Sequence, residues 1–147
     1  MKLIIDNKEI LANEGETILE AAKRSGVKIP TLCHHPKLSN YGGCRVCVVE
    51  VGGMNRLITS CTTPVSEGMV VNTDSQRIRE TRKTLLELIL SDHPNDCMTC
   101  DKTGDCTLQD LAYEYGVKEN PYTGAMRQYP TEDKNPYIIR DFSKCIL

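Results

Sequence analysis

The sequence has few of the large side chains that usually anchor a hydrophobic core. Its 147 residues include no tryptophan and one phenylalanine, and aromatic residues make up 5% of the chain. Hydrophobic residues account for 39%, so the chain can still build one domain or two small ones. We therefore expect a core that is poor in large aromatic side chains, and something other than aliphatic burial that helps to hold the chain together.

A charge surplus of one sign and long apolar runs are also missing. The net charge is −2, whereas nucleic-acid-binding proteins usually carry a basic surplus. No stretch approaches the roughly 20 apolar residues that span a membrane. Charged residues follow Ile5 at once, which excludes the apolar core of a signal peptide. The sequence therefore predicts a soluble, cytoplasmic protein with no membrane span and no nucleic-acid partner.

Familiar catalytic motifs are absent as well. The chain has no phosphate-binding loop, no G-x-G-x-x-G and no G-x-S-x-G. Two of the three histidines directly follow Cys33, so a nucleophilic Cys–His pair is conceivable. A thiol-based enzyme is the weakest of the alternatives, because the spacing of the cysteines is that of metal ligands.

Cysteine is what the chain has in abundance, with eight in all. An even number invites a disulfide interpretation, which requires an oxidising compartment. In a cytoplasmic protein, cysteines stay reduced and are more often metal ligands or catalysts. The spacing of the cysteines then indicates which of them can share a metal.

The first half of the chain has the pattern of a small mixed sheet with one helix. Asp6 and Asn7 form a turn signal between two short β-prone runs. Thr17 and Glu20 form a capping box, and Gly26 suits the position just past a helix end. The expected strands are Leu3–Ile5, Glu9–Leu11, Val46–Val51, Leu57–Thr59 and Met69–Val71.

The second half of the chain has the pattern of two helices followed by an extended tail. Asp74 or Ser75 can cap a long helix that ends near Ser91, and we expect its basic run, Arg77–Lys83 with Arg82 included, to lie on a solvated face. Thr107 can cap a shorter helix that Gly116 ends. Residues 117–147 contain several prolines and little periodicity, so they are predicted to form an extended tail.

The first group of cysteines has the spacing Cys33-x10-Cys44-x2-Cys47-x13-Cys61. Four thiolates on loops around a small sheet can hold a [2Fe–2S] cluster. The spacing differs from that of plant-type ferredoxins, and no histidine lies near the C-x2-C pair as a Rieske centre would need. A four-thiolate zinc site and two disulfides remain alternatives.

The residues around this C-x2-C pair also have expected roles. Gly42 and Gly43 let the backbone bend tightly and turn its N–H groups toward sulfur, which raises the reduction potential of a cluster. Arg45 lies between two ligands and can balance cluster charge, although a lone arginine is more often a solvated side chain.

The second group is His93-x3-Cys97-x2-Cys100-x5-Cys106. A neutral imidazole in place of a thiolate raises the potential of a cluster, so a histidine-ligated [4Fe–4S] cluster is chemically reasonable. Three thiolates and one imidazole also make a closed structural zinc site. His93 could otherwise simply cap a helix C-terminus. Cys145 has no close cysteine partner, so an unpaired thiol is the plain interpretation.

Both groups lie in motifs that resemble the N-terminal module shared by three groups of enzymes. These are the large iron–sulfur subunit of respiratory complex I, multimeric [FeFe]-hydrogenases and NAD-linked formate dehydrogenases. The resemblance covers essentially the whole chain. It lies in Ile29–Pro36, Gly43–Val51, Thr59–Pro64, His93–Asp101 and Cys106–Asp110.

The resemblance implies an α+β fold in three parts. Residues 1–73 would be a ferredoxin-like β-grasp [2Fe–2S] domain, 74–116 a small helical [4Fe–4S] segment, and 117–147 a tail leading toward a further cluster domain. The implied [2Fe–2S] ligands are Cys33, Cys44, Cys47 and Cys61, and the implied [4Fe–4S] ligands are His93, Cys97, Cys100 and Cys106. The resemblance also makes a zinc site a minor alternative for both groups.

The implied function is electron relay without catalysis by the chain's own residues. Single electrons would pass between a flavin-containing NAD(P)H subunit and the catalytic remainder of the parent protein, or a separate catalytic subunit. The alternative is a zinc-stabilised interaction module with no redox role. The sequences of two segments, Asp92–Cys100 and Asp110–Gly116, most resemble those of formate dehydrogenases and hydrogenases. The resemblance therefore favours one of these enzymes as the parent protein. Because Ile139–Leu147 resembles the approach to another cysteine motif, with Cys145 as its first ligand, we expect a longer parent subunit.

Overall fold

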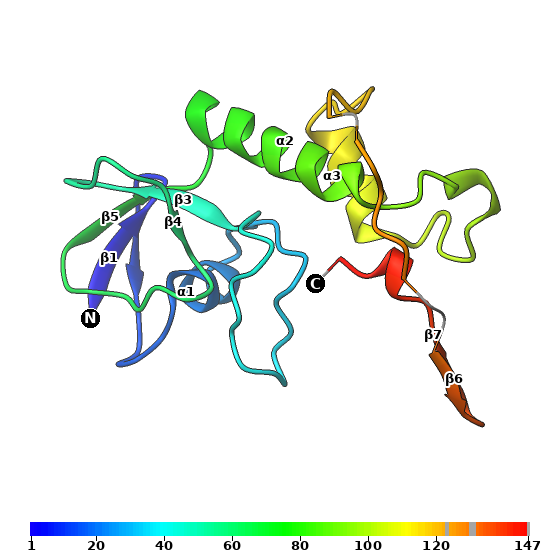
Figure 1. Ribbon diagram of the computed structural model, residues 1–147. Coiled ribbons are helices and arrows are strands. Elements are labelled where there is room, and N and C mark those ends of the chain that lie inside the picture. The colour runs from blue at the N-terminus through cyan, green and yellow to red at the C-terminus, as the bar shows by residue number, and fades with distance from the viewer. Residues whose placement is uncertain (123, 130–131, 147) are drawn as a thin grey trace. The chain divides into compact units, whose positions relative to one another are not determined.

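The computed structural model describes residues 1–122, 124–129 and 132–146 (Figure 1). The chain forms two compact units, Met1–Arg82 and Lys83–Leu147. This division falls inside a long helix, whereas the sequence placed a boundary at residue 73, ahead of it. The predicted three-part organisation remains a prediction.

A five-stranded mixed sheet forms the first unit, with strand order β2-β1-β5-β3-β4. Strands β1 and β5 are parallel, and the other neighbouring strands are antiparallel. This confirms the predicted α+β fold with a ferredoxin-like domain. The strands are β1 Lys2–Ile5, β2 Lys8–Leu11, β3 Val48–Val51, β4 Ile58–Thr59 and β5 Met69–Asn72.

The predicted hairpin at the N-terminus is confirmed. Asp6 and Asn7 both have positive φ angles, 47° and 66°, which is the conformation of a type I′ turn. Asparagine and aspartate tolerate this left-handed region better than most residues. The turn sets the register in which Leu3 faces Ile10.

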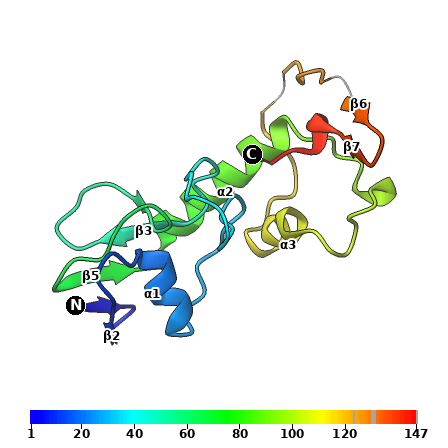
Figure 2. The same cartoon turned by 90° about the horizontal axis from the view of Figure 1, so that it is seen from below.

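Helix α1 (Ile18–Arg24) supplies the other side of the core (Figure 2). Its side chains Ile18 and Ala22 are fully buried in one cluster with Ile5 and Val71 of the sheet. The helix ends at Ser25, and Gly26 follows with φ +76°, as its sequence position predicted. Among the described residues, the buried core cluster contains aliphatic side chains and cysteines but no aromatic one, as the composition led us to expect.

The capping box of α1 gives the first testable prediction. Thr17 Oγ1 accepts a hydrogen bond from Glu20 N, and Glu20 Oε2 accepts one from Thr17 N. Thr17→Ala removes the first of these caps and is expected to lower the free energy of unfolding by about 1 kcal/mol. Anaerobic urea unfolding followed by circular dichroism measures this. Thr17→Ser, which keeps the hydroxyl, is the control; equal losses in both variants would contradict the role of the cap.

Helix α2 (Gln76–Ser91) begins as predicted, with Ser75 Oγ accepting from Ile78 N. Ile78 and Leu86 are fully buried. The prediction that its basic residues form a solvated face is wrong for one of them. Arg82 is only 3% exposed, because the face of α2 that carries Ile78 also carries residue 82 one turn later.

The second unit contains two more helical turns and a short helix. They are the 3₁₀ turn η1 (Cys97–Thr99), helix α3 (Thr107–Glu114) and the 3₁₀ turn η2 (Phe142–Lys144). Thr107 was expected to cap α3, but Cys106 is its N-cap, because Asp110 N already donates to the Cys106 carbonyl. Gly116 follows the end of α3 with φ +65°, as predicted.

The tail contains a hairpin that the sequence did not predict. Strands β6 (Glu132–Asn135) and β7 (Ile138–Arg140) pair in antiparallel fashion. The turn begins where Asn135 Oδ1 accepts from Tyr137 N, a common use of asparagine before proline. Residues 130 and 131 of the predicted tail lie outside the described residues.

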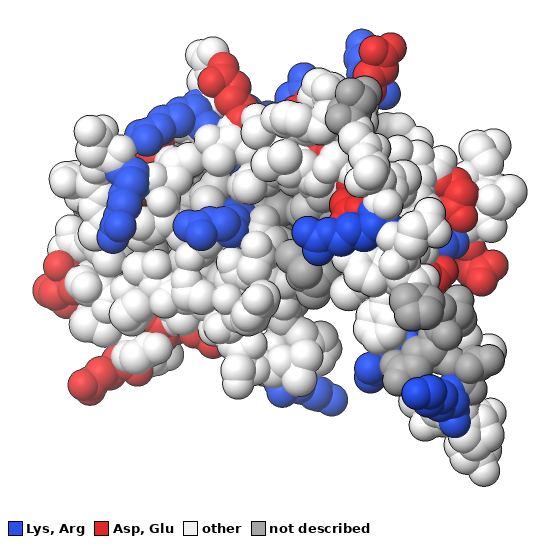
Figure 3. All heavy atoms as spheres, viewed as in Figure 1, with Lys and Arg blue, Asp and Glu red and all other residues white. Residues whose placement is uncertain are grey.

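None of the helices in the described ranges is long and apolar enough to cross a bilayer. On the face shown in Figure 3, acidic and basic side chains are scattered rather than gathered in one patch.

Candidate metal centres

The sheet brings two of the first four cysteines together. Cys47 directly precedes β3 and Cys61 follows β4, and these antiparallel strands pair Val48 with Thr59. The Sγ atoms of Cys47 and Cys61 lie 3.4 Å apart. Two thiolates held tetrahedrally by one metal at about 2.3 Å are about 3.8 Å apart, so this pair is close to the separation that one iron needs.

The other two cysteines form a second pair on the long loop. The N–H of Cys44 donates to Cys33 Sγ at 3.5 Å. Cys44, Cys47 and Cys61 are buried, and Cys33 is partly buried. The loop between Cys33 and Cys44 therefore brings the sulfur of Cys33 next to the backbone of the buried Cys44.

Glycine is required where the loop turns toward Cys44. Gly42 has a φ of +69°, which glycine adopts without strain. A Cβ at Gly43 would collide with Cε1 of the Tyr41 ring, which packs against this backbone. The N–H that the structure directs at sulfur is that of Cys44, the residue after these glycines, and the predicted role of the glycines in turning the backbone stays a prediction.

Arg45, between two of the cysteines, adopts a left-handed φ of +58°. Few residues other than glycine do so without strain. Its carbonyl accepts from Val48 N at 3.2 Å, which closes the turn ahead of β3. Its side chain is exposed, so its charge is well screened by water.

The thiols in this group cannot all ionise by themselves. Burial raises the pKa of the Cys61 thiol to about 12, and the neighbouring Cys47 adds to the effect. Burial likewise raises the pKa of Cys44. Burial also opposes ionisation of Cys33, but the N–H groups of Cys44 and Gly43 outweigh it and lower the pKa of that thiol. A bound cation would supply the positive charge that four thiolates require.

A binuclear iron cluster suits this donor set better than a single ion. The four cysteines form two pairs, Cys33 with Cys44 and Cys47 with Cys61. A [2Fe–2S] cluster has two irons, each of which takes two protein ligands, so two pairs of cysteines are the arrangement that such a cluster would use.

The second predicted group lies in one stretch of the second unit. His93 follows α2, Cys97 and Cys100 flank η1, and Cys106 caps α3. All three cysteines are partly buried, and the Cys97 carbonyl accepts from Cys100 N and from Thr103 Oγ1. These hydrogen bonds fold the loop back on itself, but within the described residues the four donors do not gather as the ligands of a single metal ion would.

His93 has the ring orientation that a metal ligand needs. Its Nδ1 lies 2.9 Å from the Pro94 carbonyl oxygen, which can only accept, so Nδ1 carries the proton. In the neutral imidazole this arrangement leaves Nε2 with a free lone pair. Metal-binding histidines usually donate their other N–H to a carbonyl or a carboxylate in this way.

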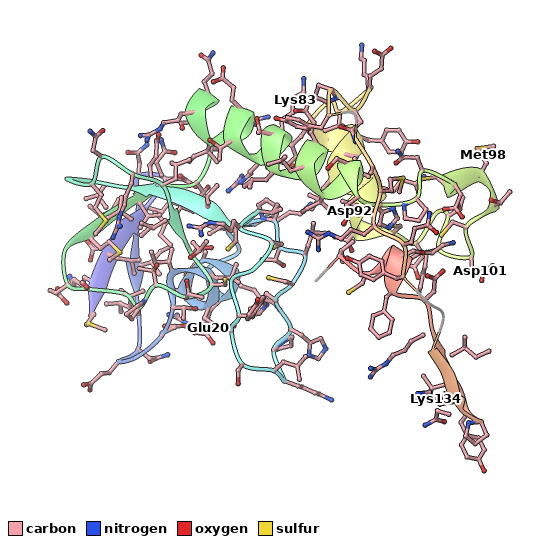
Figure 4. The ribbon with its side chains drawn as sticks, viewed as in Figure 1. Glu20, Lys83, Asp92, Met98, Asp101 and Lys134 are labelled. Atoms are coloured by element: carbon pink, nitrogen blue, oxygen red, sulfur yellow. The ribbon has the colours of Figure 1, made fainter. Side chains whose placement is uncertain are left out.

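Charged pairs surround the second group. Asp96, next to Cys97, pairs with Lys144 at 3.1 Å, and Asp92, next to His93, pairs with Arg127 at 3.5 Å. The hydrogen bond to Asp96 raises the pKa of Lys144. Figure 4 shows Met98 and Asp101 projecting from the loop, and Met98 is 94% exposed. Cys145 is exposed.

Sequence reasoning missed two residues beside the first group. Ser60 is fully buried, and its N and Oγ both donate to the Cys47 carbonyl, at 3.1 and 2.8 Å. Arg82 donates to the carbonyls on either side, those of Val46 and Val48. Ser60 could have been suspected from its place next to Cys61, whereas the contacts of Arg82 depend on long-range packing.

Two protein-family models match the chain. Residues 1–76 match the 2Fe-2S iron–sulfur cluster binding domain, and residues 82–121 match the NADH-ubiquinone oxidoreductase-G iron–sulfur binding region. The first family binds a [2Fe–2S] cluster and the second a [4Fe–4S] cluster, which confirms both predicted cofactors. Neither match supports the zinc alternative.

Relatives and a solved structure agree with these matches. The chain is 47% identical to the NADP-reducing hydrogenase subunit HndD of Solidesulfovibrio fructosivorans, covering 100% of this chain and 26% of that protein. It is 37% identical to the mitochondrial NADH-ubiquinone oxidoreductase 78 kDa subunit of Candida albicans, covering 99% of this chain and 21% of that protein. The chain thus spans about a quarter or less of the length of these relatives.

A crystal structure of NAD+-reducing [NiFe]-hydrogenase in the H2-reduced state superimposes with a TM-score of 0.92 at 37% identity. The match covers 99% of this chain and 62% of that one.

Proposed function

Because the chain belongs to the 2Fe-2S iron–sulfur cluster binding domain family, we propose that it is an electron-relay module of a multi-subunit oxidoreductase. The relatives named above are subunits of NADH- or NADP-linked enzymes. The observation that carries the proposal is the pairing of four cysteines beside β3 and β4, with main-chain N–H groups directed at sulfur. Clusters bound by such residues exchange single electrons.

The ligand assignments are part of the proposal. Cys33, Cys44, Cys47 and Cys61 would hold the [2Fe–2S] cluster, the first pair on one iron and the second pair on the other. His93 through Nε2, with Cys97, Cys100 and Cys106, would hold the [4Fe–4S] cluster. The chain's own residues would bind the clusters, limit the access of water and set their potentials through N–H donors and burial.

The partners of the module are proposed from the relatives. A subunit that handles NADH or NADPH, with a flavin to split a two-electron hydride into single electrons, would lie at one end of the relay. A catalytic centre in a longer parent protein or a separate subunit would lie at the other. Formate dehydrogenase is not among the relatives named above, so a hydrogenase or an NADH-ubiquinone oxidoreductase has more support as the parent. A cytoplasmic location would keep the thiols reduced.

Spin-quantitated EPR on the anaerobically purified, dithionite-reduced chain tests the proposal. The expected result is two signals, one from a [2Fe–2S] cluster and one from a [4Fe–4S] cluster, with iron and sulfide analyses to match. Oxidised protein should be brown and should bleach on reduction. Colourless, EPR-silent protein that contains zinc would contradict the electron-relay function and favour the interaction module.

A further inference from the structure

Arg82 is a buried charge beside the first group of cysteines. It is 3% exposed, and the other buried polar residues in the described ranges, Ser60 and Thr73, carry no charge. Its Nε donates to the Val46 carbonyl at 3.1 Å, and its Nη2 donates to the Val48 carbonyl at 2.9 Å. The guanidinium therefore binds the main chain on both sides of Cys47.

These two hydrogen bonds fix the orientation of the peptide groups on either side of Cys47. The Cys47 carbonyl itself is held by Ser60, so the carbonyls of three successive residues all have donors. In a trans peptide the C=O and the following N–H point to opposite sides. By holding the carbonyls of Val46 and Val48, Arg82 directs the N–H groups of Cys47 and Val49 away from itself.

The guanidinium of Arg82 holds a permanent positive charge in a buried position, shielded from water. A [2Fe–2S] cluster with four thiolate ligands carries net negative charge, which increases by one when it accepts an electron. Within a weakly screened interior, a fixed cation beside Cys47 would favour that reduced state.

We propose that Arg82 is a positioning residue of the [2Fe–2S] site, which holds the Cys47 segment in place and raises the reduction potential of the cluster through its permanent charge. The inference rests on the proposed function, because it requires the cluster on Cys47 and its partners. The cluster gains one electron from an external reductant such as dithionite. No bond is made or broken, and Arg82 stays protonated throughout.

Two other arginines, Arg45 and Arg79, differ from Arg82 because their side chains are exposed to solvent. Arg45 lies between two of the cysteines, but its side chain is exposed. Arg79, one turn before Arg82 on α2, is 59% exposed and pairs with Asp74. Solvent screens both charges, so position in the sequence is a poor guide to which arginine acts on the cluster.

An EPR-monitored redox titration of the [2Fe–2S] cluster in the whole chain tests this. Arg82→Gln removes the charge and is expected to lower the equilibrium constant for reduction about tenfold, which is about 59 mV for a one-electron couple. Arg82→Lys keeps the charge and is expected to stay within about threefold of the unaltered chain. Arg79→Gln, the matched control on an exposed face, should leave the constant unchanged.

The outcomes separate this inference from the proposed function. An unaltered chain with no [2Fe–2S] signal would defeat the proposed function itself. A normal cluster whose potential is the same in Arg82→Gln as in the unaltered chain would overturn the role of Arg82 alone, as would equal shifts in the Gln and Lys variants. If Arg82→Gln retains no cluster, retention by Arg82→Lys supports the need for charge, and loss in both reduces Arg82 to a structural residue and overturns the proposal.

Discussion

Replacing Cys61 by alanine is expected to abolish the [2Fe–2S] EPR signal while the [4Fe–4S] signal persists. Cys61 is 2% exposed, and its sulfur lies 3.4 Å from that of Cys47. No other cysteine adjoins β4, so no thiol can take its place without moving the sheet. Alanine also lacks the oxygen with which serine could bind iron. Spin quantitation should fall from about one [2Fe–2S] spin per chain to about zero.

The matched control for this change is Cys145→Ala. Cys145 is exposed and belongs to the other compact unit, so its loss should leave the [2Fe–2S] spin count unchanged. Survival of the [2Fe–2S] signal in Cys61→Ala would refute the ligand assignment. Because binding of a metal centre contributes to folding, the same variant should also unfold at lower urea than the Cys145 variant does.

The second large effect is expected at His93. Replacement by cysteine keeps a ligand in place but exchanges a neutral imidazole for a negative thiolate. The extra negative charge disfavours reduction, so the potential of the [4Fe–4S] cluster should fall by about 59 mV or more, tenfold in the one-electron equilibrium. Redox titration followed by EPR at the temperature of the [4Fe–4S] signal measures the change.

The [2Fe–2S] cluster in the same sample serves as the internal control for His93→Cys. Its proposed ligands lie in the first unit, so its potential should stay where it is in the unaltered chain. A [4Fe–4S] potential that stays constant or rises would show that His93 does not bind the cluster. His93 would then be a helix-capping side chain, which is the alternative that the sequence left open.

Much of the fold could be predicted because it depends on local signals. Asp6-Asn7 specifies a hairpin turn, Thr17 and Glu20 specify a helix start, and Gly26 specifies a helix end; each acts over a few residues. The tail hairpin was missed because its strands lack alternation and its Asn135-Pro136 turn is a weak signal. The start of α3 was missed by one residue because threonine is a better general cap than cysteine.

The features of the candidate metal centres depend partly on the sequence and partly on the tertiary structure. The sequence by itself determined the donor types, their spacing and the glycines before Cys44, because these are read directly from the residues. The two kinds of cluster came from the resemblance of the motifs to a known family, because the donor types alone also allowed zinc. Only the tertiary structure decided that Cys47 meets Cys61 and that Arg82, rather than Arg45, is the buried cation beside them. The physical reason is that strand pairing and desolvation depend on contacts between residues far apart in the chain, which no local pattern encodes.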